Sequence, residues 1–123
     1  MADKELLEML AAETDRRAPL MIQGIEWLSS ADAPDSDRVE AVRVEAHGLK
    51  GAAMVVGESR LALLGERLEI ALVQRNAPGT IDAGLGATLA AGVRALQEGA
   101  RAAAAGQPEP ASVDEALAAL SDH

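Results

Sequence analysis

The stretch 45-EAHGLKGAAMVVG-57 has the apolar spacing of a helix, yet it contains glycines at positions 48 and 51. Glycine inside a helix costs about 1 kcal/mol relative to alanine. Gly48 directly follows His47, and Gly51 directly follows Lys50. Two glycines next to a histidine and a lysine in one helix indicate that another group approaches this surface of the helix closely. Gly48 lies to the side of that surface and also fits close packing of a neighbouring helix.

The apolar residues of this helix fall on one face about 100° wide, the width of a core-facing stripe. They are Val39, Val42, Ala46, Leu49, Ala53 and Val56. His47 lies roughly 130° from the middle of that face. Its neighbours at helical spacings on its own face are Glu40, Arg43, Val44, Lys50, Gly51 and Met54. We therefore expect the imidazole to point away from the core, beside the ammonium of Lys50.

The composition of the whole chain favours an all-α fold. The 123 residues suffice for one domain with one core. Phe and Tyr are absent and Trp27 is the only aromatic residue, whereas β-sheets are rich in aromatic and β-branched residues. Ala, Leu, Glu and Arg dominate instead. These residues are good helix formers, so we predict an all-helical bundle.

Charge and cysteine content exclude several classes of function. The formal net charge of −9 argues against nucleic-acid binding, which needs an excess of Lys and Arg, and against an anionic membrane surface. There is no Cys, so disulfides, thiolate metal sites and cysteine nucleophiles are excluded. No apolar run approaches the ~18–20 residues of a spanning helix, and the start lacks a signal-peptide pattern. We expect a cytoplasmic protein.

Apolar residues at spacings of three and four predict five helices. They span about 3–28, 38–56, 59–75 and 81–105, with a short last helix that ends near residue 120. Pro19 should kink or split the first helix. The expected caps are Asp35, Ser36 or Asp37 before the second helix, Gly57 after it, Thr80 before the fourth, and a capping box of Ser112 and Glu115 in the last.

Short loops between helices of this length favour an antiparallel up-down four-helix bundle. We place this bundle in residues 1–106, and a linker with a short additional C-terminal helix in residues 107–123. Each helix has one apolar stripe rather than two. The isolated domain is therefore expected to be a monomer.

The third predicted helix carries two acidic residues that can reach the histidine. Glu66 and Glu69 stand three residues apart on one edge of this helix, with Gly65 beside them. A carboxylate on one ring nitrogen of His47 would leave the other nitrogen as an unprotonated nucleophile. Taken alone, both carboxylates fit better as solvated surface charge, because the chain has 20 Asp and Glu residues.

Residues 46–69, AHGLKGAAMVVGESRLALLGERLE, resemble the histidine-containing phosphotransfer (HPt) domain. The pattern of that family is Ala-His-x-Leu-Lys-Gly, then Gly, then Leu-x-x-Leu-x-x-x-Leu-Glu at set distances. All of its anchors are present, as Ala46, His47, Leu49, Lys50, Gly51, Gly57, Leu61, Leu64, Leu68 and Glu69. The four-helix HPt fold also agrees with the bundle expected from periodicity.

The resemblance implies that His47 accepts a phosphoryl group from a histidine kinase catalytic domain or from a receiver aspartate. It then passes the group to the aspartate of a response-regulator receiver domain. Glu69 is expected to hydrogen-bond Nδ1 of His47, Lys50 to offset phosphoryl charge, and Gly51 to leave room for the incoming group. ATP and Mg²⁺ are expected to be supplied by the partner domains, and this chain is expected to bind no cofactor or metal itself.

We expect the partner to dock on the face of His47. Small or apolar residues flank the histidine, and charged residues form a rim that tunes the choice of partner. The apolar residues are Val44, Ala52, Met54 and Val55, and the charged residues are Glu40, Arg43 and Glu58. Met54 fits a second role equally well, as a gap-filling residue against another helix.

A fifth helix, and a start at the first bundle helix, make the chain similar to the first domain of a chemotaxis-type histidine kinase. Those kinases commonly carry a histidine at the position of Glu66. A free-standing phosphorelay protein or a domain of a hybrid kinase is the alternative. Two readings from other classes are a non-catalytic helical interaction bundle and a small hydrolase with His47 as general base. The hydrolase lacks a Ser, Cys or metal constellation in the sequence.

Overall fold

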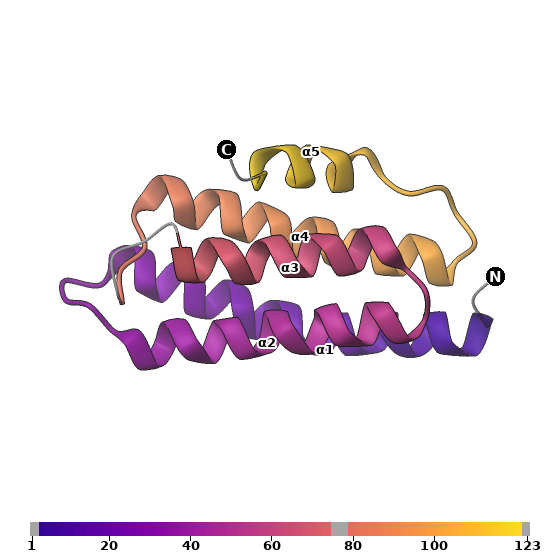
Figure 1. Ribbon diagram of the computed structural model, residues 1–123, viewed down its shortest axis with the longest axis horizontal. Helices are drawn as coiled ribbons and strands as arrows, with labels where there is room; N and C mark the ends of the chain where they lie inside the picture. Colours follow the sequence, from indigo (N-terminus) through magenta and orange to yellow (C-terminus); the bar gives the residue numbers. More distant parts are fainter. Residues whose placement is uncertain (1–2, 75–78, 122–123) are drawn as a thin grey trace.

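The computed structural model describes residues 3–74 and 79–121, and these ranges contain helices and no strand. The helices are α1 (Lys4–Ser30), α2 (Ser36–Val55), α3 (Ser59–Gln74), α4 (Ala83–Ala104) and α5 (Ala111–Ala119). Figure 1 shows α1 to α4 side by side, successive helices running in opposite directions, and the short α5 beside α3 and α4. The predicted all-α class is confirmed.

One apolar core lies between the four long helices. α1 and α3 each pack against both α2 and α4. All six residues of the predicted stripe on α2 are buried, as are the four leucines of the α3 stripe, Leu61, Leu64, Leu68 and Leu72. Leu7 on α1 and Leu85 on α4 are partly buried at the margin of the core. In the described part of the chain, no helix is long and apolar enough to cross a membrane.

Pro19 does not split the first helix, so that part of the expectation was wrong, and a kink at Pro19 stays a prediction. α1 continues without a break from Lys4 to Ser30. A proline removes one helical hydrogen bond and crowds the preceding turn. The ring of Pro19 is exposed, whereas Ala18 and Met21 beside it are buried in the core. Packing of the residues on both sides of the proline therefore keeps the helix continuous through it.

The predicted ends of α2 are confirmed. Asp35 is the N-cap, and its carboxylate accepts a hydrogen bond from the backbone N–H of Arg38 at 3.0 Å. After α2, Gly57 adopts a φ of 79°, a conformation that favours glycine. The N–H of Glu58 then donates to the carbonyl of Ala53 at 2.9 Å, and the N–H of Gly57 donates to the carbonyl of Met54 at 3.1 Å. This pair of bonds is a Schellman motif.

Two other predicted caps were wrong. α4 begins at Ala83, and its N-cap is Asp82 rather than Thr80, because the carboxylate of Asp82 accepts from the N–H of Leu85 at 2.8 Å. α5 has Pro110 at its N-cap and no side-chain capping bond. Ser112 lies inside the first turn of α5, and its buried hydroxyl has no hydrogen-bond partner among the residues that the structure describes. The capping box of Ser112 and Glu115 is therefore not formed.

α5 packs onto the same core as the four long helices. Val113, Ala116, Leu117 and Leu120 are buried against α3 and α4. Arg60 of α3 pairs with Glu109 at 3.0 Å and also with Asp114. Further along α3, Nη1 of Arg67 donates to the carbonyl of Leu117 at 2.6 Å. The division of the chain into a bundle of residues 1–106 and a C-terminal segment of residues 107–123 stays a prediction.

Candidate functional site

His47 projects from the outer side of α2, and the predicted orientation is confirmed. Its side chain is 65% exposed. Ala46 and Leu49, which lie on the opposite side of the helix, are 0% and 1% exposed. The imidazole therefore stands clear of the core on a rigid helix, where a partner protein can reach it.

Glu69 of α3 contacts the inner edge of this ring. Oε1 of Glu69 lies 3.2 Å from Nδ1 of His47. The carboxylate is only 17% exposed, so it lies between the helices rather than in bulk solvent. Because Nδ1 faces a carboxylate, Nε2 is left at the outer edge of the ring. The expected approach of an acidic residue from α3 to His47 is thus present.

Gly65 explains why α3 comes so close to α2. A Cβ at Gly65 would lie 3.1 Å from Cα and 3.2 Å from the backbone nitrogen of Lys50, closer than a side chain normally tolerates. Gly65 precedes Glu69 by one helical turn. The close approach at Gly65 therefore brings Glu69 within reach of His47. The sequence placed Gly65 beside the acidic residues but gave no sign of this contact with Lys50.

Arg43 is part of this cluster. Its Nη1 donates to Oε2 of Glu69 at 2.6 Å, and its Nε donates to Oε2 of Glu40 at 2.8 Å. These hydrogen bonds, first with Glu40 and then with Glu69, raise the pKa of Arg43. In turn, the hydrogen bond from Arg43 lowers the pKa of Glu40 below its usual value. The predicted rim residue Arg43 is thus also an ion-pair partner of Glu69.

Lys50 and Glu66 face each other one turn further along. Nζ of Lys50 lies 3.7 Å from Oε1 of Glu66, and the lysine side chain is 27% exposed. Both residues line an open groove of about 550 Å³ between α2 and α3, together with Met54 and Leu63. Met54 is 61% exposed. Met54 therefore borders the groove from the solvent side and does not fill a gap in the core.

The two glycines inside α2, Gly48 and Gly51, have different surroundings. Gly51 is exposed, and a Cβ built on it would meet nothing within 4 Å. A Cβ on Gly48, by contrast, would lie 2.5 Å from Nη1 of Arg17 of α1. That guanidinium bonds Glu45 of α2 at 3.2 Å. Gly48 therefore makes room for an arginine from the neighbouring helix, whereas Gly51 leaves open space beside His47.

The sequence model of the Hpt domain matches residues 5–99, which run from the first turn of α1 into the last part of α4. The chain belongs to the Hpt domain family. Its function is therefore histidine phosphotransfer in a phosphorelay, a form of two-component signalling in which Hpt domains interact with histidine kinases and response regulators. No curated protein matches the sequence.

The remaining predicted docking residues of this Hpt domain fall into two places. Val44 and Val55 are 49% and 79% exposed on the outer side of α2. Glu58 lies beyond the end of α2, after the left-handed Gly57. Its place in the docking rim stays a prediction.

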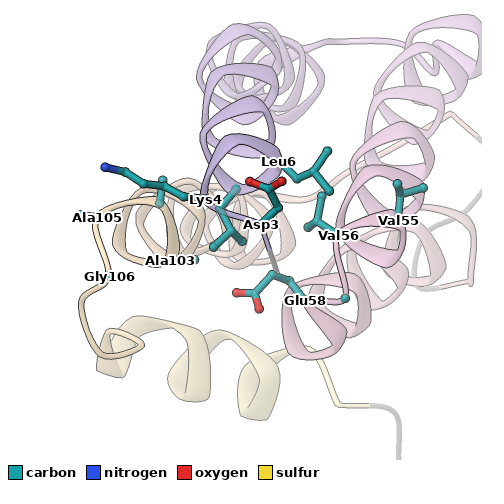
Figure 2. Close-up of a pocket in the computed structure, with 12 residues that line it drawn as sticks. Asp3, Lys4, Leu6, Val55, Val56, Glu58, Ala103, Ala105 and Gly106 are labelled. Atoms are coloured by element: carbon teal, nitrogen blue, oxygen red, sulfur yellow. The ribbon is translucent and has the colours of Figure 1, made fainter. Parts of the chain in front are cut away.

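Glu58 lines a cavity of about 1090 Å³ at the end of the bundle. Figure 2 shows the carboxylates of Asp3 and Glu58 at this cavity, while the ammonium of Lys4 points away from both. Neither His47 nor Glu69 lines it. The cavity is thus separate from the cluster around the histidine.

In the ranges 3–74 and 79–121, no group of three or more His, Asp or Glu side chains is placed to hold a metal ion. Each carboxylate near His47 forms an ion pair with a cation or contacts the imidazole ring. Glu69 and Glu40 bond Arg43, and Glu66 faces Lys50. That magnesium comes from a partner domain stays a prediction.

Proposed function

We propose that His47 is the phosphoacceptor of this Hpt domain. One observation carries the proposal: Nδ1 of the ring lies 3.2 Å from Oε1 of Glu69 while the side chain is 65% exposed. A nucleophilic imidazole needs one nitrogen protonated and oriented, and the other nitrogen free and accessible. The contact with Glu69 and the exposure of the ring support both conditions for His47.

The transfer step follows from this arrangement. Nδ1–H of the neutral ring donates to Glu69, and the lone pair of Nε2 attacks the phosphorus of the donor. An N–P bond forms as the bond from phosphorus to the leaving oxygen of ADP or of a receiver aspartate breaks, and that oxygen takes the electron pair. The ring keeps its Nδ1 proton and becomes positive, and the carboxylate of Glu69 stabilises that charge. Transfer to the next receiver aspartate reverses these bonds.

Lys50 and Gly51 serve the incoming phosphoryl group in this proposal. Phosphoryl transfer depends mainly on positioning and on electrostatic stabilisation of the oxygens. The ammonium of Lys50 is one turn from His47 and moves from Glu66 toward a phosphoryl group when one arrives. The open space at Gly51 admits the active-site loops of the partner. The exposed side chains of Val44, Met54 and Val55 supply apolar contact for the partner around that opening.

Labelling experiments test the role of His47 directly. The full chain is incubated with a histidine kinase and radiolabelled ATP, or with a phosphorylated receiver domain. We expect an acid-labile, alkali-stable label on the wild-type chain and no label on His47→Gln. His123→Gln is the matched control, because His123 is the only other histidine of the chain, and it should label as the wild type does. An undiminished label on His47→Gln would reject the proposal.

We further propose that the domain works in a chemotaxis-type kinase. The support is the additional helix α5, which packs onto α3 and α4 and is joined to α3 by Arg60 and Arg67. Glu66 departs from the histidine that is common at its position in those kinases. Discharge rates of the phosphorylated chain to a panel of receiver domains test this assignment. Fastest discharge to a receiver outside chemotaxis would favour a phosphorelay of another type.

A further inference from the structure

The carboxylate of Glu69 is shared between a permanent cation and the imidazole. Its Oε2 accepts from Nη1 of Arg43 at 2.6 Å, and its Oε1 faces Nδ1 of His47 at 3.2 Å. Arg43 is itself anchored, because Nε and Nη2 both donate to the carboxylate of Glu40, at 2.8 Å and 2.5 Å. Four side chains thus form a continuous line from Glu40 through Arg43 and Glu69 to His47.

We propose that Arg43 is a positioning residue for phosphotransfer, which holds Glu69 on Nδ1 of His47 and so leaves Nε2 as the nucleophilic nitrogen. This inference rests on the proposed role of His47 and extends it to a residue that does not touch the ring. It has a geometric part and an electrostatic part.

The geometric part comes from the planar guanidinium. A glutamate carboxylate rotates easily about its terminal bond, so a single contact with the ring would not fix its orientation. Arg43 presents its donors in a rigid fork, and Glu40 fixes one side of that fork. Since the other side holds Oε2 of Glu69, the remaining oxygen is aimed at Nδ1. The partly buried position of Glu69, 17% exposed, limits competition from water.

The electrostatic part concerns the attraction between Arg43 and Glu69. The guanidinium of Arg43 bears a permanent positive charge and lies on the carboxylate that faces the ring. A charge-assisted hydrogen bond of this kind is stronger than a neutral one, so it holds the carboxylate in place. The other charged groups on the helices around the ring are paired. Glu40 pairs with Arg43, Lys50 of α2 with Glu66 of α3, and Arg17 of α1 with Glu45 of α2. Arg43 is the cation bound directly to Glu69.

The test uses the full chain with Arg43→Gln, Arg43→Lys and the control Arg101→Gln. Arg101 pairs with Asp15 at 2.9 Å between α4 and α1, so its substitution removes the same charge and one ion pair without touching α2 or α3. Phosphoramidate serves as the phosphodonor, because a small donor needs no docking surface. The measurements are the initial rate of phosphorylation between pH 6 and 8 and the ¹⁵N NMR signals of the imidazole, with circular dichroism as a check on folding.

We expect Arg43→Gln to phosphorylate about tenfold more slowly than the wild type, because Glu69 no longer holds the ring in place. Its ring signals should show a mixture of tautomers in place of one form protonated at Nδ1. Arg43→Lys should recover part of the rate through its charge but not the single tautomer, because it lacks the fork. Arg101→Gln should behave as the wild type.

Wild-type ring signals and an unchanged rate in folded Arg43→Gln would overturn this inference and leave His47 as phosphoacceptor. A loss that appears with a protein donor but not with phosphoramidate would also overturn it, since Arg43 would then act in docking. If Arg43→Gln does not fold, the ring signals of Arg43→Lys test the inference instead. A mixture of tautomers supports it, and a single tautomer protonated at Nδ1 overturns it. Failure of the proposed function itself has a separate signature, namely labelling of His47→Gln.

Discussion

Gly51 weakens α2 at a position where packing gives no reason for a glycine. It is exposed, and a Cβ there would meet nothing within 4 Å. Alanine at an interior helical position is about 1 kcal/mol more favourable than glycine. The position lies one turn from His47, on the same side of the helix. The sequence thus gives up helix stability beside an exposed imidazole, which fits the close approach of a partner.

Substitutions at Gly51 should separate folding from transfer. Gly51→Ala is expected to raise the free energy of unfolding by about 0.5–1 kcal/mol, because helix propensity improves without a clash. Gly51→Leu should fold as well, yet slow transfer from a phosphorylated receiver domain at least about tenfold. Urea unfolding and labelling rates measure the two effects. Transfer to Gly51→Leu at the wild-type rate would show that no partner approaches this turn, and an equal loss with phosphoramidate would place the effect on the ring itself.

The contact between α2 and α3 sets the geometry of the histidine cluster. Gly65 lies against the backbone of Lys50, and Glu69, one turn along α3, reaches His47. If α3 moved away from α2 at Gly65, the carboxylate of Glu69, one turn along the same helix, would also move away from His47. The helix contact is therefore as important to the site as the side chains themselves.

Gly65→Ala tests this contact against the same substitution in open space. Its new Cβ would lie 3.1–3.2 Å from backbone atoms of Lys50, which cannot swing aside as a side chain can. We expect Gly65→Ala to be about 1–3 kcal/mol less stable than Gly51→Ala. The ¹⁵N signals of His47 should also show a weakened contact of Nδ1 with Glu69. Equal stability of the two variants would mean that α2 and α3 adjust without cost.

The periodicity of α2 was sufficient to predict which residues are buried and that His47 points outward. Each of these depends on one helix alone. The contacts of Gly65 with Lys50 and of Arg43 with Glu69 depend on the register of two helices, which one sequence does not reveal. The cap of α4 was misplaced because Thr80 and Asp82 are both good N-cap residues, and only the backbone path selects Asp82. At α5, the helix starts one residue before Ser112.

In the described chain, buried residues of α5 belong to the same core as those of the four long helices. The buried residues of α5 lie against α3 and α4 on the side away from α1 and α2. His47 is on α2, so α5 leaves the face of the histidine uncovered. The fifth helix thus adds apolar burial without obstructing a partner that approaches α2.

Truncation of the buried C-cap residue of α5 should destabilise the whole bundle. Leu120 is 3% exposed, and Leu120→Ala is expected to lower the free energy of unfolding by about 2–4 kcal/mol. Val55→Ala removes an apolar side chain that is 79% exposed, and it should change stability by less than about 0.5 kcal/mol. Thermal or urea unfolding followed by circular dichroism measures both. If Leu120→Ala unfolds like the control, α5 is not part of the cooperative unit.

The position of the phosphorus atom on the ring tests the central claim most directly. The full chain is labelled with ¹⁵N-histidine, phosphorylated by a receiver or kinase, and examined by ¹⁵N and ³¹P NMR. If Glu69 occupies Nδ1, the phosphorus must couple to Nε2 of His47, and the proton must stay on Nδ1. Phosphorus on Nδ1, or on any residue other than His47, would contradict the account.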